Sequence, residues 1–360
     1  MRRYLPLLSL LGAVAAFLAA CGGSANPTTT ADTTTTTVST TTTAEPATTT
    51  ATEPETLVIY SGRSEELVAP LIETFEEESG IDAEVRYGSS TEMAATIVTE
   101  GASSPADVFY AQDPSTIGSV RELLAPLDDS ILALTPERFQ DPEGYWTGVT
   151  VRSRVLAYNP ELVSEDDLPG SFHELTDPAW AGQVGLAPTN GSFLTFVDAM
   201  MVLEGEDATI EWLQGMAAND IVEFDGNSPI AAAIDAGDIS VGLINHYYLL
   251  RLAAEQGGTT ALNYYWPNPD AGSYVMPSGA AVLATAQNPK GAAAFIEFLL
   301  SNESQTYFAE SIFEFPVVEG APAPAGAPAI DTLVSPQIPL TDLAETFGRA
   351  TDLITESGLL

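Results

Sequence analysis

The sequence predicts an α/β fold with two domains, and three features indicate it. First, apolar segments of strand and helix type alternate along residues 57–124, as in folds with a parallel sheet. Second, a similar alternation returns over residues 184–300, after a long apolar β segment at 146–158. Third, the chain has 360 residues, of which the first 56 have no globular character, and a folded part of roughly 300 residues favours two domains.

The first series contains short strands separated by amphipathic helices. The predicted elements are a strand at 57–60, a helix that ends at Gly80, a strand around Val85, helix 91–100, strand 107–110 and a helix that ends at Leu124. Pro70 lies inside the first of these helices and predicts a late start or a kink.

The second series follows the same rule and places polar turns between its strands and helices. The predicted elements are strand 184–187, turn 189–192, helix 193–203, a helix around Trp212, strand 221–224, turn 227–229, a short Ala-rich helix, strand 240–244, helix 249–255, strand 278–284, helix 289–300, loop 319–329 and a final helix 342–356.

The N-terminal 56 residues indicate export rather than a folded domain. Residues 1–20 combine Arg2 and Arg3 with an apolar run, which is typical of a signal peptide. Cys21 follows small residues, and this arrangement resembles the lipobox of bacterial lipoproteins, in which the cysteine is acylated. Residues 21–56 are rich in Thr and lack aromatic residues, so we expect a disordered tether behind the lipidated Cys21.

Composition excludes several classes of function. Fifty acidic residues face eleven basic ones, a formal net charge of −39, which argues against nucleic-acid binding and against membrane contact except through a lipid anchor. His173 and His246 are the only histidines, and a structural role is favoured for each. The sequence has no phosphate loop and no Gly-x-Ser-x-Gly elbow, so we expect no enzyme activity.

Two adjacent tyrosines mark the strongest candidate site. Tyr247 and Tyr248 follow the predicted strand 240–244, and ligands of open α/β sheets bind at the carboxyl ends of strands. A strongly charged cation such as iron(III) can displace the protons of two neighbouring phenols and bind the phenolate oxygens. The alternative is that both rings are packing residues in a core or hinge.

Polar turns between strands and helices supply a second signal. They recur at 61–64, 189–192, 227–228 and 245–248. Exposed amides at helix N-termini bind small anions such as carbonate or phosphate, and such an anion could complete the coordination sphere of a metal. The alternative is that these Ser and Asn side chains only cap their helices.

The chain resembles the iron(III)-binding periplasmic proteins of ABC importers. The resemblance is carried by residues 57–64, 104–110, 152–154, 189–193, 244–248 and 278–283, and extends over nearly all of 57–360. It implies the type II periplasmic-binding-protein fold, in which two α/β lobes joined by crossing hinge strands close over the ligand. It also implies that Tyr247 and Tyr248 bind iron. The positions matching those that hold the synergistic anion in the family are Asn190, Gly191, Ser192, Asn227 and Asn245.

Some family ligands are replaced in this chain. Ser64 and Gln112 stand where well-known relatives have His and Glu, and Phe193 stands where some relatives have an extra Tyr. Asp113, Gln112, Tyr145, water or a second oxygen of the anion are the candidates to complete the metal site. Arg63 and Arg154 are candidates to hold the anion.

We therefore expect a lipid-anchored, extracytoplasmic and monomeric receptor. It would capture iron(III) with carbonate or phosphate between the lobes and deliver it to a membrane permease. The expected first lobe comprises 57–153 and 278–330, and the second 154–277 and 331–360. Two alternatives remain at this stage: the same fold with another solute, such as a phosphonate, polyamine or thiamine-like compound, or a surface lipoprotein without a transport role.

Overall fold

The computed structural model describes residues 56–338 and 340–360. The predicted signal peptide, Cys21 and the tether up to residue 55 lie outside the described residues. Within the described ranges, no helix is long and apolar enough to cross a membrane.

A mixed β-sheet organises the described chain. Its strands are β1 (Leu57–Ser61), β2 (Ala83–Tyr87), β3 (Val108–Ala111), β4 (Leu124–Ala125), β5 (Trp146–Tyr158), β6 (Val184–Leu186), β7 (Val222–Glu223), β8 (Val241–Asn245), β9 (Leu262–Tyr264), β10 (Val275–Leu283) and β11 (Phe315–Pro316). The strand order is β2-β1-β3-β10-β5-β8-β6-β7. Strand β1 runs parallel to β2 and β3, and β6 runs parallel to β7 and β8, whereas β10 and β5 are antiparallel to their neighbours.

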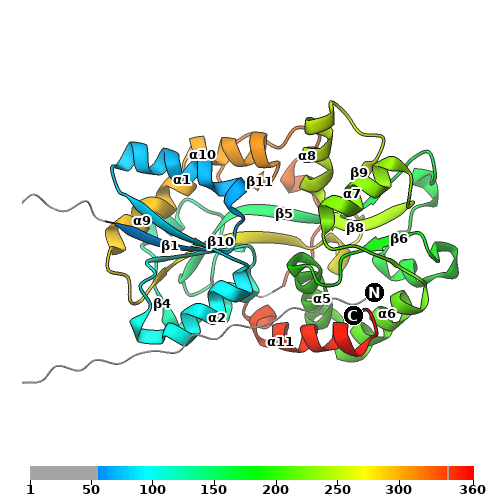
Figure 1. Cartoon of the computed structure of the whole chain (residues 1–360), viewed down its shortest axis with the longest axis horizontal. Helices are drawn as coiled ribbons and strands as arrows, with labels where there is room; N and C mark the ends of the chain where they lie inside the picture. Colours follow the sequence, from blue (N-terminus) through cyan, green and yellow to red (C-terminus); the bar gives the residue numbers. More distant parts are fainter. Residues whose placement is uncertain (1–55, 339) are drawn as a thin grey trace, which may run out of the picture. The chain divides into compact units, whose positions relative to one another are not determined.

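Helices cover the sheet in both halves. They are α1 (Glu65–Ser79), α2 (Ser90–Glu100), α3 (Pro114–Gly118), α4 (Asp129–Leu132), α5 (Gly191–Glu204), α6 (Glu206–Ala218), α7 (Asn227–Ala236), α8 (His246–Gln256), α9 (Pro289–Leu299), α10 (Asn302–Tyr307) and α11 (Leu340–Glu356). Figure 1 shows α1, α2 and α9 around one half of the sheet and α5 to α8 around the other.

The long strand β5 belongs to both halves of the sheet. Its first part pairs with β10 and its last part pairs with β8 and β9, and Figure 1 shows β5 and β10 side by side between the two halves. Val149 and Val151 of β5 enter the core beneath α1 and α9, while Leu156 and Tyr158 enter the core beneath α5 and α6. This is the type II periplasmic-binding-protein fold, with two α/β lobes joined by crossing strands, as predicted.

Local differences from the predicted elements have simple causes. Helix α1 begins at Glu65, so Pro70 does not delay its start. Glu65 and Glu66 in its first turn complement the helix dipole. The helix expected to reach Leu124 is instead the short α3, which ends at Gly118, followed by a 3₁₀ turn over Arg121–Leu123. The two-residue strands β4 and β11 and the short β9 are too brief to show a sequence period.

The most relevant difference concerns the tyrosines. Helix α8 begins at His246, directly after β8 ends at Asn245, and not near residue 249 as predicted. Asn245 thus serves both as the last strand residue and as the residue before the helix. Tyr247 and Tyr248 consequently lie in the first turn of a helix, whose backbone geometry fixes their orientation.

Candidate functional site

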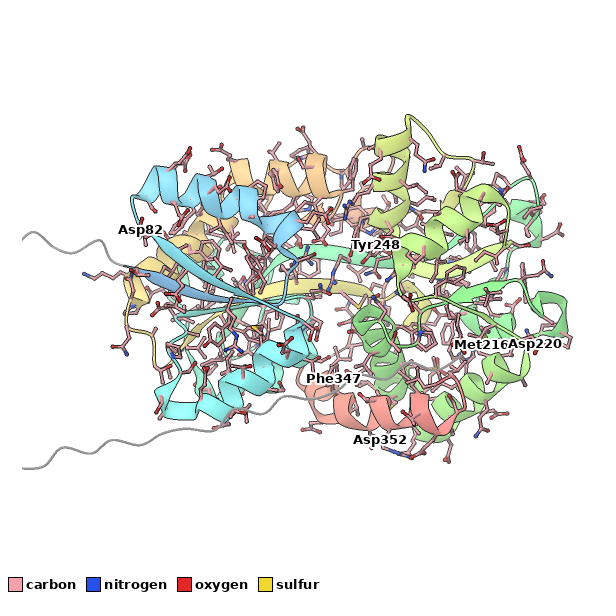
Figure 2. All side chains as sticks on the ribbon, in the orientation of Figure 1. Asp82, Met216, Asp220, Tyr248, Phe347 and Asp352 are labelled. Carbon is pink, nitrogen blue, oxygen red and sulfur yellow. The ribbon has the colours of Figure 1, made fainter. Side chains whose placement is uncertain are left out.

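The two adjacent tyrosines form a stacked pair. Their ring centroids are 4.2 Å apart with 28° between the planes. Tyr247 is 5% exposed, whereas Tyr248 is half-buried, and neither hydroxyl donates a hydrogen bond to a described residue. Figure 2 shows Tyr248 below α8, between the two halves of the sheet. Two phenol oxygens on one helical turn are therefore available to a ligand.

Burial raises the pKa of the Tyr247 hydroxyl well above its usual value. The charges of Tyr248 and Glu314 raise this pKa further, and those of Arg152 and Arg63 oppose them. Tyr247 therefore keeps its proton at neutral pH unless a cation displaces it. The described chain contains no cluster of three His, Cys, Asp or Glu side chains suited to a metal. A metal at this position would depend on phenolate oxygens.

The polar turns predicted to hold an anion come together beside the tyrosines. The Oδ1 atom of Asn190 accepts hydrogen bonds from the Ser192 amide at 3.0 Å, the Ser192 hydroxyl at 2.6 Å and the Asn227 side-chain amide at 3.1 Å. Asn190 precedes α5, Asn227 begins α7 and Asn245 ends β8. Gly191 has open space where a side chain would begin. The N-termini of three helices therefore meet at one point.

Arg154 connects this cluster to β5. Its Nη1 donates to the Ser192 hydroxyl at 3.0 Å and to Oδ1 of Asn245 at 3.3 Å, and its Nη2 donates to the Leu243 carbonyl at 3.1 Å. Burial lowers the pKa of Arg154 to about 9, and the nearby tyrosines oppose this shift. Its Nε and the side-chain nitrogen of Asn245 lack partners in the described chain. The cluster therefore offers unused hydrogen-bond donors, which suit an anion.

Arg63 has a carboxylate partner, whereas Arg154 donates only to neutral groups. It is fully buried and forms a 2.7 Å ion pair with Glu314, which is also fully buried. Glu314 accepts a second hydrogen bond from the hydroxyl of Thr150. Burial acts to raise the pKa of Glu314, but Arg63 and Arg152 outweigh it, so the pKa is lowered. One Nη atom of Arg63 is engaged by Glu314, while Nε and Nη1 have no partner in the described chain.

The other positions considered as metal ligands are Ser64, Gln112 and Asp113, which lie in the turn after β1 and the turn before α3. Ser64 is exposed, and Gln112 is half-buried with its backbone amide bonded to the Ser90 hydroxyl. Asp113 caps α3 by accepting from the Thr116 amide at 2.8 Å, and burial raises its pKa.

Two aromatic positions do not join the site. Tyr145 lies against Arg121, whose guanidinium carbon is 4.3 Å from the ring centroid. Tyr145 is nine residues before Arg154, about 30 Å away along an extended strand. Phe193 is buried in a core, with its ring 5.8 Å from that of Phe196.

His246 has the structural role that its sequence context favoured. Its Nδ1 accepts from the Ser153 amide at 3.2 Å, and its ring stacks on Phe315 with centroids 4.4 Å apart. Burial lowers its pKa to about 4, so it is neutral at physiological pH. His246 therefore anchors the start of α8 beside the tyrosine pair.

Several residues near the site were missed in the sequence. Glu314 and Asp198 are buried and distant from the tyrosines in sequence, and nothing in their local context marks them. Tyr110 and Ser278 are also buried; they lie in segments that carry the family resemblance, but no site role was predicted for them. Arg152 had a visible signal, because two arginines alternating within an apolar strand share one face of it.

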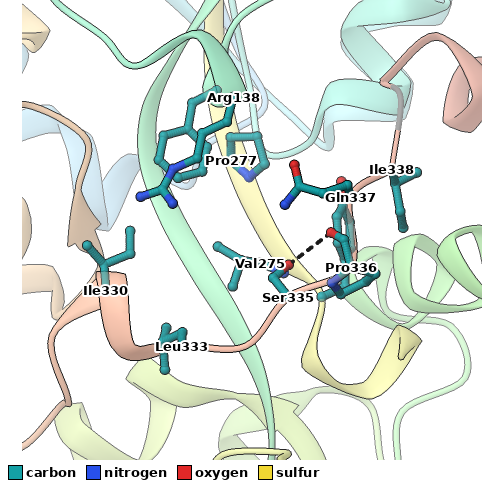
Figure 3. Close-up of a pocket in the computed structure, with 11 residues that line it drawn as sticks. Arg138, Val275, Pro277, Ile330, Leu333, Ser335, Pro336, Gln337 and Ile338 are labelled. Carbon is teal, nitrogen blue, oxygen red and sulfur yellow. Dashed lines mark hydrogen bonds between the residues drawn. The ribbon is translucent and has the colours of Figure 1, made fainter. Parts of the chain in front are cut away.

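A small cavity of about 60 Å³ lies on another face of the crossing strands. Figure 3 shows Val275 and Pro277 of β10 beside it, with Leu333, Ser335 and Gln337 of the C-terminal segment. Ser278 belongs to the opposite face of β10. It hydrogen-bonds to Thr150, which in turn donates to Glu314. This cavity is therefore not part of the tyrosine site.

Comparison with known proteins matches this geometry to a family. Residues 103–333 match the family described as bacterial extracellular solute-binding protein. The chain is 33% identical over 316 residues to the Fe(3+)-binding periplasmic protein of Serratia marcescens, covering 86% of this chain and 92% of that protein. The chain belongs to this family of bacterial extracellular solute-binding proteins.

Two further comparisons agree with this assignment of the solute-binding protein. It is 32% identical over 310 residues to a major ferric iron-binding protein of Neisseria meningitidis, covering 84% of this chain and 93% of the relative. Its fold matches the crystal structure of iron-bound HitA from Pseudomonas aeruginosa with a TM-score of 0.80 and 34% identity, covering 85% of this chain and all of HitA.

Proposed function

We propose that this solute-binding protein captures iron(III) with a small anion and delivers it to the permease of an ABC importer. The stacked pair Tyr247 and Tyr248 is the observation that carries the proposal. It places two phenol oxygens on one helical turn, and neither oxygen donates to a described residue. Relatives described as iron(III)-binding proteins support the choice of metal.

The donor cluster beside the tyrosines completes the proposed site. Asn190, Gly191, Ser192, Asn227, Asn245 and Arg154 would hold carbonate or phosphate, and the anion and water would fill the iron positions that the two phenolates leave open. Asp113 is the reserve ligand, although its Oδ1 is engaged by the Thr116 amide. Gln112 remains a weaker candidate, and Arg63 would donate to the anion only through Nε and Nη1, because Glu314 engages its Nη2.

The proposed lobes keep the boundaries inferred from the sequence, 57–153 with 278–330 and 154–277 with 331–360. The apolar cores support this division, because Leu343 and Leu353 of α11 pack with residues of α5 and α6. Interlobe contacts then include Arg251 of α8 with Glu66 of α1, at 2.8 Å. Lipidation of Cys21 would hold the monomeric protein at the outer face of the cell membrane.

Iron affinity tests the proposal. Wild type, Tyr247→Phe and Tyr248→Phe would compete with a chelator for iron(III) in carbonate buffer, with Tyr264→Phe as a matched control in the same lobe. We expect each site variant to lose at least about a hundredfold in affinity, because a phenolate ligand cannot be replaced by a phenyl ring. Wild-type affinity in both variants would refute the site.

The proton displaced from Tyr247 gives a second readout. Since this phenol is protonated at neutral pH, iron binding releases its proton and affinity rises with pH. The slope of log affinity against pH should be smaller by about one in Tyr247→Phe than in wild type. An unchanged slope would exclude Tyr247 as a ligand.

A further inference from the structure

An ion pair connects helix α1 to helix α8, and these helices cover different halves of the sheet (Figure 1). Nη2 of Arg251 donates to Oε1 of Glu66 at 2.8 Å. Only 24% of the Arg251 side chain is exposed, whereas 76% of the Glu66 side chain is exposed. The pair therefore bridges the two proposed lobes at the protein surface and not within an apolar core.

The ion pair lies one helical turn beyond the buried tyrosine. Tyr247 and Arg251 are four positions apart in α8, so their side chains share one face of that helix. Arg63, in the turn before α1, is close enough for its charge to act on Tyr247. Glu66 belongs to the first turn of α1. The start of α1 thus faces two successive turns of α8, so a movement of the lobes that opens the proposed iron site also separates Glu66 from Arg251.

The surroundings of the pair allow it to part without loss of apolar packing. A cavity of about 360 Å³ lies beside it, lined by Leu67, Tyr307 and Phe313 as well as by the two charged residues. Open space here takes the place of the interdigitated side chains that hold packed helices together. The interaction that joins α1 to α8 at this point is therefore mainly electrostatic.

Arg251 has a second carboxylate within its own helix. Its Nη2 is 3.9 Å from Oε1 of Glu255, one turn further along α8. Because both residues belong to one helix, this contact persists when the lobes move apart. Arg251 then exchanges a close pair with Glu66 for the contact with Glu255 alone, so its charge keeps a counter-charge in both positions of the lobes. This exchange lowers the cost of opening the cleft.

We propose that Glu66 and Arg251 form an interlobe latch that retains bound iron(III), and that Glu255 is the partner of Arg251 once the lobes have opened. Glu66 is a positioning residue, because it would hold α8 against α1 and would not act as an iron ligand. The proposal rests on the proposed function, since it concerns release of the same cargo. Both carboxylates are exposed to solvent, so the strength of the latch should fall as the ionic strength rises.

The rate of iron release tests the latch. The iron-loaded full chain, Glu66→Gln and Glu255→Gln would each be mixed with excess chelator, and the loss of phenolate-to-iron absorption would be followed over time. Glu65→Gln is the matched control. Glu65 is an exposed carboxylate in the same turn of α1, and it forms no ion pair with a described residue.

The two carboxylates that contact Arg251 should have different effects. At low salt, Glu66→Gln should release iron about two- to fivefold faster than wild type, which corresponds to the coupling of an exposed ion pair. Glu255→Gln should release iron at the wild-type rate or more slowly, because Arg251 loses its partner in the open form. In about 1 M salt, Glu66→Gln and wild type should release iron at nearly the same rate.

Three results would overturn the latch. The first is an unchanged release rate in Glu66→Gln at low salt. The second is an equal acceleration in Glu65→Gln or Glu255→Gln. The third is an acceleration in Glu66→Gln that persists undiminished at high salt, because a screened ion pair cannot produce it.

Failure of the latch is distinguishable from failure of the proposed function. If wild type takes up no iron, the proposed function fails, and small-angle scattering of the metal-free proteins then decides the latch. Wild type should have a smaller radius of gyration than Glu66→Gln at low salt, and the two radii should converge at high salt. Equal radii at low salt would refute the latch. The N-terminal segment is common to both proteins, so a difference reports on the folded part.

Discussion

Arg63 and Glu314 form a 2.7 Å ion pair although they are 251 positions apart in the sequence. The pair joins the turn after β1 to the segment before β11, and neither side chain is exposed. Phe313, directly before Glu314, has a φ of 64°, which is unusual for a residue with a side chain. A short π-helical turn over Phe308–Ile312 precedes it. This backbone directs Glu314 toward Arg63.

Breaking the ion pair should destabilise the fold strongly. Glu314→Gln leaves Arg63 buried without a counter-charge, so the free energy of unfolding should fall by about 3–5 kcal/mol. Urea unfolding at pH 7 measures this change. The double variant Arg63→Met with Glu314→Leu should recover most of the loss, because it removes both charges together. Additive losses in the double variant would contradict the coupling.

The same carboxylate predicts a dependence on pH. The folded-state pKa of Glu314 is lowered, so its contribution to stability is present above the unfolded-state value near pH 4.3 and is lost as the pH falls through the folded-state pKa. Wild type should therefore lose stability below about pH 4 more steeply than Glu314→Gln. Parallel stability curves for the two proteins would contradict this assignment.

Asp198 predicts the opposite pH dependence. It accepts hydrogen bonds from Ser115 of α3 and Thr346 of α11, and burial raises its pKa to about 7. The folded state therefore favours the protonated acid, and stability falls as the pH rises from about 4 to 7. Asp198→Asn should be more stable than wild type above pH 7 by about 1–2 kcal/mol, with a smaller difference at pH 4. Thermal unfolding at both pH values measures this, and a larger gain at pH 4 would contradict it.

A substitution at Gly191 tests anion binding without disturbing the fold. It is the first residue of α5, exposed, and a side-chain carbon there would meet no atom within 4 Å. Gly191→Ala should therefore fold with a melting temperature close to that of wild type. If the anion approaches the backbone here, the added methyl group should weaken iron binding by about tenfold or more.

The matched control for Gly191 is Gly348→Ala. Gly348 is an exposed residue of α11, outside the proposed site, and a side-chain carbon there also meets no atom within 4 Å. This change should therefore leave iron binding unchanged. Equal affinity in wild type and Gly191→Ala would place the anion elsewhere.

Much of the fold was predictable, because its helices and longer strands have clear periods and turn residues. Residues 146–158 were expected as one β segment between domains, and β5 has those bounds. The start of α8 was placed too late because Tyr247 and Tyr248 give no helical signal and no loop separates β8 from α8. The Ser115–Asp198 and Arg63–Glu314 contacts were not predictable, since each joins distant elements through one side chain from each.

The candidate site was predictable in part. Asn190, Ser192, Asn227, Asn245 and Arg154 follow strand ends or alternate on β5, and the fold brings them together. Arg152 shared this pattern, but the missing hydrogen-bond partner of its Nε could be recognised only when the positions of its neighbours were known.

The most direct test of the central claim is a titration of the metal-free full chain with chelated iron(III) in carbonate or phosphate, followed by visible absorption. We predict a phenolate-to-iron charge-transfer band that saturates at one iron per chain and is abolished or greatly reduced in Tyr247→Phe and Tyr248→Phe. Tyr264→Phe should retain it. Absence of the band at every anion concentration, or an unchanged band in both site variants, would contradict the account.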